Sequence, residues 1–373
     1  MVVLLAPPSD GGISGGYLYN AMISKYAPQG SFYYQTVFSQ QPFDVSLFEK
    51  LPQVFTHLIL DSLFFNYPEW VKQIAEYYSG KLLFLVHYLP SESPRLSEEE
   101  KKKLRGYEDY CFQFCRAVIA TGPSTVSALK KRGHVPDTII EVTPGIDKKL
   151  LFGSKALSDE KSPLSVGSRQ LSGNGNVIEQ ALSEVGYKGK QEKPLVFFSA
   201  MNWTREKNHT FLLDVLSELQ YGAWVWIIAG TYSEDNNYIK QFKKKAEEMG
   251  LLHRIYIAGE ISHQHVLACM KAAHVFLFPS LVESYGMAVA EAMAAGCSVV
   301  ANDIEAVHNL ISNKKEGLLC RPQDKGGWVR ALKDLVFSPD KRRAIGKAAV
   351  KKSLSFPSWE ETAEKFVRKA ELV

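Results

Sequence analysis

The chain has 373 residues, of which 46% are hydrophobic and 23% are charged, and this composition excludes wholesale disorder. One ordinary core could not hold so long a chain, so two domains are expected. The net charge of +4 is modest. No uncharged apolar run of about 18 residues is present, so we expect no membrane-spanning helix.

The cysteines and the first residues of the chain indicate the cellular compartment in which the protein is expected. The five cysteines, an odd number, stand among apolar neighbours, and Met1 leads into an apolar run without the basic flank of a secretory signal. No matching Cys or His pair accompanies Cys111 and Cys115, so we expect buried thiols and no metal site. A cytoplasmic protein with reduced thiols is predicted.

Five apolar runs in the first part of the chain have the length and composition of buried strands, and they alternate with helix-like segments. They are Val2 to Ala6, His57 to Leu60, Leu82 to Val86, Ala117 to Ala120 and Thr138 to Val142. Apolar strands separated by helices are typical of a parallel sheet with crossover helices. Residues 1–152 are therefore predicted to form one doubly wound, Rossmann-like α/β domain.

Residues 153–193 are rich in Ser, Gly and Lys and are predicted to form a linker with one short helix, Val177 to Val185. Five further strand-like runs are Leu195 to Ala200, Trp224 to Gly230, Arg254 to Gly259, Val275 to Pro279 and Ser298 to Asp303. They predict a second doubly wound parallel sheet in residues 194–355. A last amphipathic helix occupies residues 356–373, with Ser358 as its expected N-cap.

A glycine-rich turn follows the first strand and opens the helix Tyr17 to Tyr26. Gly11 and Gly12 form one adjacent pair and Gly15 and Gly16 a second, so the dinucleotide fingerprint G-x-G-x-x-G is not matched. The first pair would let the backbone approach a phosphate, and the second would relieve crowding in the first helical turn. A plain tight turn is the alternative.

Two further strand ends carry polar side chains. His87 follows the run Leu82 to Val86. Two interpretations of this histidine stay open, a ligand contact and a packed structural residue. The segment Met201 to Asn208 contains Arg205 and Lys207 near a helix start, which suits a diphosphate clamp. A solvated lysine is the alternative for Lys207.

Residues 280–291 place two carboxylates around a strand end, a glycine turn and a helix start. Glu283, in the loop, can accept hydrogen bonds from sugar hydroxyls, and Glu291, within the helix, can accept from a ribose diol. The loop and helix-start residues between them, whose amides can donate to a sugar or a phosphate, are Ser284, Tyr285, Gly286, Met287 and Ala288. Two solvated glutamates beside a core helix are the alternative.

Glu283 and Glu291 have seven residues between them, and the Ala-rich stretch 292–295 after them ends at Gly296. This pattern resembles the signature of the family 4 retaining glycosyltransferases. The resemblance implies the two-domain GT-B fold, in which two Rossmann-like doubly wound parallel-sheet domains face a cleft and the last helix crosses back to the first domain. It also implies transfer with retention of the anomeric configuration. No aspartate-rich metal motif is present, so a metal-independent reaction is expected.

The resemblance assigns further roles by position. Gly11–Gly12 matches a paired glycine facing the donor diphosphate, and His87 matches a strand-end histidine close to the transferred sugar. Lys207 matches a phosphate-binding lysine. Asn202 stands where the family usually has an arginine, so that role is either unfilled or taken over by Arg205.

Two segments concern the nucleotide base. Glu260 and Ile261, after Gly259, resemble the loop whose backbone pairs with the base. Tyr232 stands where the family has the second glycine of a Gly-x-Gly segment that begins at Gly230.

We therefore predict a hexosyltransferase of carbohydrate biosynthesis that moves a sugar from a UDP- or GDP-linked donor to an acceptor hydroxyl, without a cofactor. His87, Lys207 and Glu283 are its expected catalytic residues. The acceptor can be a glycan, a lipid or a small molecule. Two alternatives stay open: a nucleotide-sugar epimerase or phosphorylase of the same fold, and a non-catalytic nucleotide-sugar-binding subunit.

Basic residues gather between Lys341 and Lys352, with Arg343, Lys347 and Lys351 at four-residue spacing. A solvated helix face is the favoured interpretation. Peripheral contact with an anionic membrane surface stays open, and no nucleic-acid partner is expected.

Overall fold

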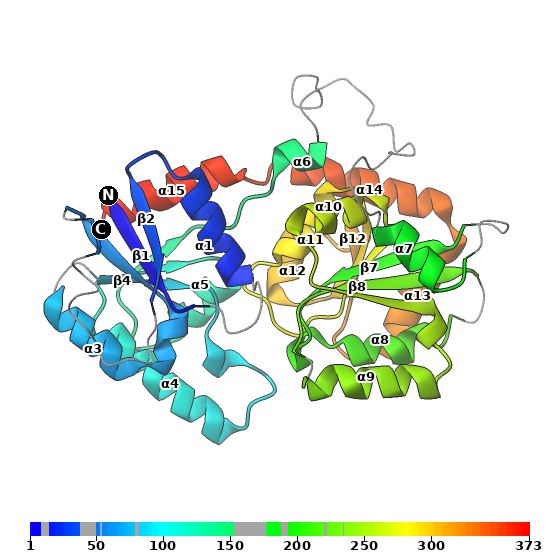
Figure 1. The fold of residues 1–373 in the computed structure, drawn as a ribbon, viewed down its shortest axis with the longest axis horizontal. Helices are drawn as coiled ribbons and strands as arrows, with labels where there is room; N and C mark the ends of the chain where they lie inside the picture. The colour runs from blue at the N-terminus through cyan, green and yellow to red at the C-terminus, as the bar shows by residue number, and fades with distance from the viewer. Residues whose placement is uncertain are drawn as a thin grey trace. The chain divides into compact units, whose positions relative to one another are not determined.

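The computed structural model describes residues 1–8, 15–37, 50–52, 54–78, 82–152, 177–187, 193–219, 222–233 and 235–373. The chain divides into two compact units (Figure 1). The first comprises Met1–Gly145, Glu283–Tyr285 and Pro357–Val373, and the second Ile146–Val282 and Gly286–Phe356. Each unit holds one six-stranded sheet with helices on its faces, which confirms the predicted class of two doubly wound α/β folds.

The sheet of the first unit is parallel, with the strand order β2-β1-β3-β4-β5-β6. Its strands are β1 (Val2–Ala6), β2 (Phe32–Thr36), β3 (His57–Asp61), β4 (Leu82–Val86), β5 (Ala117–Ala120) and β6 (Thr138–Glu141). β1 pairs with β2 on one side and with β3 on the other. The chain therefore runs from β1 outward to β2 and then returns past β1 to β3, which reverses the direction of strand addition. In open α/β sheets ligands bind at the carboxyl ends of the strands near such a reversal.

Helices cover both faces of this sheet (Figure 1). They are α1 (Gly15–Tyr26), α3 (Pro68–Tyr77), α4 (Glu98–Phe112), α5 (Pro123–Lys130) and α15 (Trp359–Glu371), with the 3-10 helices η1 (Ser62–Asn66) and η2 (Pro90–Glu92). On one face Phe84 belongs to a buried apolar cluster with Trp70 of α3 and Phe112 of α4. On the other face α1 packs against α15, which Ser358 begins as the predicted N-cap.

The second unit repeats this architecture with a different strand order, β12-β11-β10-β7-β8-β9. Its parallel strands are β7 (Leu195–Ala200), β8 (Trp224–Ala229), β9 (Ile255–Gly259), β10 (Val275–Phe278), β11 (Ser298–Asn302) and β12 (Gly317–Cys320). The chain runs from β7 outward to β9 and then returns to β10, beside β7. The reversal of order therefore lies between β7 and β10.

Helices again lie on both faces of the second sheet (Figure 1). They are α6 (Lys148–Phe152), α7 (Val177–Glu184), α8 (His209–Leu216), α9 (Asn237–Glu248), α10 (His263–Ala272), α11 (Met287–Ala294), α12 (Glu305–Leu310), α13 (Lys325–Phe337) and α14 (Pro339–Ser353), with η3 (Arg205–Lys207) and η4 (Leu252–Arg254). The core on one face joins Trp226 and Leu277 to α8, α9 and α13. Apart from β9 at one edge, the strands between the faces are almost wholly buried, as their continuous apolar sequence requires.

The ten predicted strands are all present, with ends that differ by at most a residue, whereas β2 and β12 were not predicted. Both lie at an edge of their sheet. β2 is half-exposed and mixes aromatic with polar residues, and β12 has only four residues. β2 therefore lacks the apolar run by which the inner strands are recognised, whereas β12 is a short apolar run that was missed.

The cysteines of the described residues are free thiols. Cys111, Cys269, Cys297 and Cys320 are buried, as predicted, while Cys115 is half-buried. Burial is the main cause that raises the pKa of each of the four buried thiols to about 12, so they stay uncharged. Among the described helices none is both long and apolar enough to cross a membrane.

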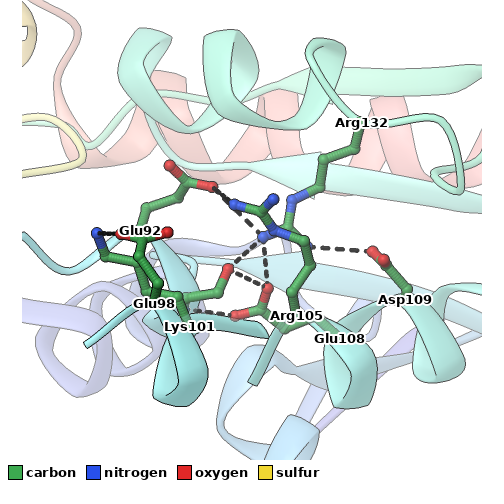
Figure 2. A network of polar contacts seen from close by, with 8 residues as sticks. Glu92, Glu98, Lys101, Arg105, Glu108, Asp109 and Arg132 are labelled. Carbon is green, nitrogen blue, oxygen red and sulfur yellow. Dashed lines mark hydrogen bonds and ion pairs between the residues drawn. The ribbon is translucent and has the colours of Figure 1, made fainter. Parts of the chain in front are cut away.

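A buried ion-pair network anchors the segment that follows β4 (Figure 2). Glu108 of α4 accepts hydrogen bonds from the backbone nitrogen of Ser91 at 2.9 Å and from its hydroxyl at 2.6 Å. The guanidinium of Arg132 lies 2.6 Å from Glu108 and 3.2 Å from Asp109. Because Ser91 closely follows His87 in the chain, this network holds the loop that begins at the histidine.

Candidate active site

The loops after β7 and β10 meet where the strand order of the second sheet reverses. The backbone nitrogen of Leu281, after β10, donates to the carbonyl of Glu206, after β7, at 2.9 Å. The Nζ atom of Lys207 lies 5.9 Å from the ring centroid of Phe278, the last residue of β10. The structure thus brings together the lysine segment and the glutamate segment that the sequence singled out separately.

Arg205 and Lys207 contact different rings. The guanidinium carbon of Arg205 lies 5.9 Å from the ring centroid of Tyr238, on α9, whereas Lys207 lies over the end of β10. Asn202, at the family's arginine position, accepts a hydrogen bond from the backbone of Thr231 at 3.2 Å. Asn202 therefore links the loops after β7 and β8.

The loop after β8 approaches that after β7 very closely. A Cβ atom at Gly230 would lie 1.9 Å from the carbonyl oxygen of Met201, so only glycine fits there. Tyr232 is partly exposed and its ring packs edge-on against Trp203, with a centroid distance of 6.3 Å. The same ring approaches Gly259, which precedes the predicted base-pairing residues Glu260 and Ile261.

Gly286 is the N-cap of α11 and has φ of +90°, in the left-handed region that favours glycine. No side chain caps this helix. The backbone nitrogens of Val289 and Ala290 both donate to the carbonyl of Gly286. The amides of Met287 and Ala288 precede them in the first turn, where helical N–H groups have no intrahelical acceptor.

Asn302 supports the loop after β10 and was missed by sequence reasoning. Its amide donates to the carbonyls of Pro279 at 2.6 Å and Ser280 at 3.1 Å, and its oxygen accepts from the indole of Trp328 at 3.1 Å. The side chain is fully buried at the end of β11. A polar residue closing an apolar strand was the signal that could have indicated it.

Glu291 is buried in α11, and its carboxylate lies 2.7 Å from the Nε2 atom of His263. His263 is the first residue of α10 and follows the loop that contains Glu260 and Ile261. Glu291 is therefore held next to the loop predicted to meet the nucleotide base. Its predicted contact with a ribose stays a prediction.

Glu283, Ser284 and Tyr285 belong to the first unit. The hydroxyl of Ser284 donates to the carbonyl of His87, so two residues predicted from distant motifs are in contact. Glu283 is half-buried. Burial, followed by the charge of Glu141, raises the pKa of Tyr285 to about 12, which keeps its phenol uncharged.

His87 lies at the carboxyl end of β4, beside the first turn of α1. Its Nε2 atom is 3.2 Å from Asp61 and 3.1 Å from Asn20. A Cβ atom at Gly16 would lie 2.9 Å from the imidazole, which confirms that this glycine relieves crowding, whereas Gly15 has open space. Gly11 and Gly12 lie outside the described residues.

Three of the six basic residues of α14 form ion pairs with nearby carboxylates. Lys341 lies 2.8 Å from Asp334, Arg343 pairs with Asp340, and Lys352 lies 3.9 Å from Glu316. These contacts agree with a solvated helix face. In the part of the chain that the structure describes, no group of three or more His, Cys, Asp or Glu residues is arranged to hold a metal ion.

Part of the chain is similar in sequence to known proteins. Residues 185–352 match the family described as "Glycosyl transferases group 1". The D-inositol 3-phosphate glycosyltransferase of Corynebacterium jeikeium (strain K411) is 30% identical over 165 residues, which cover 43% of this chain and 39% of that protein. The protein of the same description from Corynebacterium aurimucosum is 25% identical over 246 residues, covering 66% and 54% respectively. The chain thus spans about half or less of the length of these relatives.

Solved structures share the fold at low sequence identity. Sucrose-phosphate synthase from Thermosynechococcus elongatus has a TM-score of 0.75 and 16% identity, over 100% of this chain and 98% of that one. HepE from Anabaena, solved in complex with UDP and glucose, has a TM-score of 0.75 and 17% identity over 100% of both chains. These solved structures share the fold of this chain, two Rossmann-like α/β units of the GT-B type.

Proposed function

We propose that this protein is a retaining, metal-independent hexosyltransferase that moves a sugar from a nucleoside diphosphate donor to an acceptor hydroxyl. The observation that carries the proposal is the joining of the loops after β7 and β10 at the reversal of strand order. The hydrogen bond between Leu281 and Glu206 holds Lys207 beside the end of β10. The start of α11 follows in the same loop, so a cation and helix-start amides are both supplied to an anionic ligand.

In this proposal Lys207 and the amides of Met287 and Ala288 bind the diphosphate. As the glycosidic bond breaks, negative charge grows on the leaving diphosphate, and these groups stabilise it more in the transition state than in the ground state. Glu291, held by His263, accepts from the ribose. Glu283 and His87 contact the transferred sugar.

The donor is UDP- or GDP-linked in this proposal. HepE was solved with UDP and glucose, and the curated relatives are named for D-inositol 3-phosphate. UDP-hexoses and GDP-hexoses are therefore the first donors to test, and D-inositol 3-phosphate is the first acceptor.

The test is incubation of the purified chain with each donor, with and without acceptor, in the presence of a metal chelator. The proposal requires an acceptor-dependent product whose anomeric configuration, read by NMR, is that of the donor. Conversion of the donor without acceptor indicates an epimerase, and a requirement for inorganic phosphate indicates a phosphorylase. Donor binding without any turnover indicates a non-catalytic subunit.

A further inference from the structure

A buried polar cluster surrounds the imidazole of His87 in the first unit. It brings together Asn20 of α1, Asp61 at the end of β3 and His87 after β4. Asn20 and Asp61 are fully buried, whereas the side chain of His87 keeps 14% of its surface exposed. His87 is thus the member of the cluster that a ligand can reach.

The hydrogen bonds within this cluster have a direction. The amide nitrogen of Asn20 donates to Asp61 Oδ2 at 2.7 Å, so the amide oxygen of Asn20 is the atom 3.1 Å from His87 Nε2. Asp61 Oδ2 lies 3.2 Å from the same nitrogen, while Asp61 Oδ1 accepts from the backbone of Leu63 at 2.9 Å. His87 Nε2 therefore faces two acceptors, and a ring nitrogen in that position must carry a hydrogen.

Asp61 remains a carboxylate in this environment. Burial acts to raise its pKa, but the charge and hydrogen bond of His87, with the hydrogen bonds from Leu63 and Asn20, hold the pKa below its ordinary value. Tyr34 of β2 also faces the cluster. Burial, followed by the charge of Asp61, raises the pKa of Tyr34, so that group stays neutral.

The position of the ring is fixed from other sides as well. Tyr19 packs edge-on against the imidazole at 5.3 Å, and the backbone of Gly16 lies against it. The backbone carbonyl of His87 accepts from Thr125 at 3.3 Å and from Ser284. Rotation of the ring would therefore break the contacts at Nε2 and meet α1.

We propose that Asp61 and Asn20 are positioning residues that hold the proton of His87 on Nε2 and leave Nδ1 as the nitrogen that contacts the transferred sugar. This inference rests on the proposed function. When the ring is neutral, Nδ1 can accept a hydrogen bond from a sugar hydroxyl. Neither Asp61 nor Asn20 touches the sugar, and both act through the histidine.

The test is nitrogen NMR of the histidine-labelled full chain under alkaline conditions, with the His87 signals assigned by their loss in His87→Gln. The wild type should show a hydrogen on Nε2 and a bare Nδ1 that shifts when donor is added. Asp61→Asn keeps the shape of the side chain and can still accept from Leu63, but it turns an NH2 group toward Nε2. It should therefore populate the other tautomer.

Kinetics provide the second measurement. Asp61→Asn should lower kcat by about 10- to 150-fold, as expected for the loss of a charged hydrogen bond, while the affinity for the nucleoside diphosphate changes less than about twofold. Asp137→Asn, an exposed substitution in the same unit, should change neither the tautomer nor kcat. If Asp61→Asn does not fold, the wild-type spectrum still shows which nitrogen of His87 carries the hydrogen. Asn20→Leu, which removes the other acceptor at Nε2, then replaces Asp61→Asn as the test variant.

A wild-type ring with its hydrogen on Nδ1 would overturn the inference, as would an unchanged tautomer in Asp61→Asn. Both outcomes leave the proposed function intact if transfer is observed. If no sugar nucleotide binds or reacts, the proposed function fails by itself, whatever the tautomer.

Discussion

At the scale of single residues, His209 is a titratable group whose pKa folding changes strongly. It is fully buried at the start of α8 and stacks on Trp203 at 4.4 Å. Burial, aided by the charge of Lys207 and opposed by the backbone of Met201, lowers its pKa from 6.5 to about 3. Between these values the unfolded chain binds a proton that the folded chain does not, so stability must fall as the pH falls.

We expect this one histidine to contribute a slope of about 1.4 kcal/mol per pH unit across that window. His209→Phe keeps the stacked ring and should remove the contribution, which urea unfolding at several pH values measures. His134→Asn, at an exposed position, is the control and should keep the wild-type slope. Equal slopes for His209→Phe and the wild type would contradict the assignment.

Glu291 gives a second prediction at this scale, because a buried carboxylate paired with His263 is placed to bind the nucleoside part of the donor. Glu291→Ala should weaken binding of nucleoside and nucleoside diphosphate alike, by about 10- to 150-fold for a charged hydrogen bond. Isothermal calorimetry measures both. Unchanged affinity for the nucleoside would rule out the ribose contact.

The sequence indicated Glu291, Glu283, Lys207 and His87 because each stands at a strand end or a helix start. His263 and Asp61 also stand at a helix start and a strand end, but their pairing with Glu291 and His87 could not be predicted. Each comes from a different strand or helix, and the pairing depends on the order of strands in the sheet, which single-sequence patterns do not encode.

At the scale of elements, the network around Arg132 tests how the loop after β4 is held. Arg132→Met would leave Glu108 buried without its ion partner and should cost about 3–5 kcal/mol of unfolding free energy. Arg105 makes only an exposed contact with Glu92 at 3.5 Å (Figure 2), so Arg105→Met should cost less than about 1 kcal/mol.

Urea unfolding of the two variants checks this difference. Adding Glu108→Gln to Arg132→Met should recover part of the loss, because it removes the unpaired charge. Equal stabilities of Arg132→Met and Arg105→Met would show that the buried pair does not anchor the loop.

The inner strands were predictable because strands buried on both faces must be continuously apolar. The edge strand β2 is half-exposed and does not carry that pattern, so it emerged only from the structure, whereas the edge strands β6 and β9 were predicted.

At the scale of the whole molecule, residues from both ends of the chain build the first unit. Phe366 of α15 is fully buried and meets Tyr19 of α1, with a ring distance of 6.3 Å. Phe366→Ala should destabilise this unit by roughly 3–5 kcal/mol. The affinity for nucleoside diphosphate should hardly change, because the residues proposed to bind the phosphates, Lys207 and the start of α11, do not belong to α15.

Differential scanning calorimetry and ligand titration of the same sample measure the two effects. Leu372→Ala, at an exposed position of the same terminal segment, is the control and should alter neither. A large loss of nucleotide affinity in Phe366→Ala, in the temperature range where the variant is folded, would contradict the assignment of phosphate binding to the second unit.

The sequence predicted two α/β units, because alternating apolar strands and helices imply that class of fold, while the returning helix was implied by the resemblance. It could not distinguish the two strand orders, since both arise from the same alternation. Yet the order in the second sheet is what places Lys207 beside β10.

The central claim is that the reversal of order between β7 and β10 forms a nucleoside diphosphate site. Calorimetric titration of the wild type, Lys207→Ala and Lys240→Ala with a nucleoside diphosphate and its bare nucleoside tests it most directly. Lys240→Ala is the control, because it removes the same charge as Lys207→Ala from an exposed position on α9. We predict that Lys207→Ala lowers the affinity for the nucleoside diphosphate by about 10- to 150-fold and leaves the affinity for the nucleoside unchanged. Lys240→Ala should bind both ligands as the wild type does. Equal diphosphate affinities in all three proteins would contradict the claim.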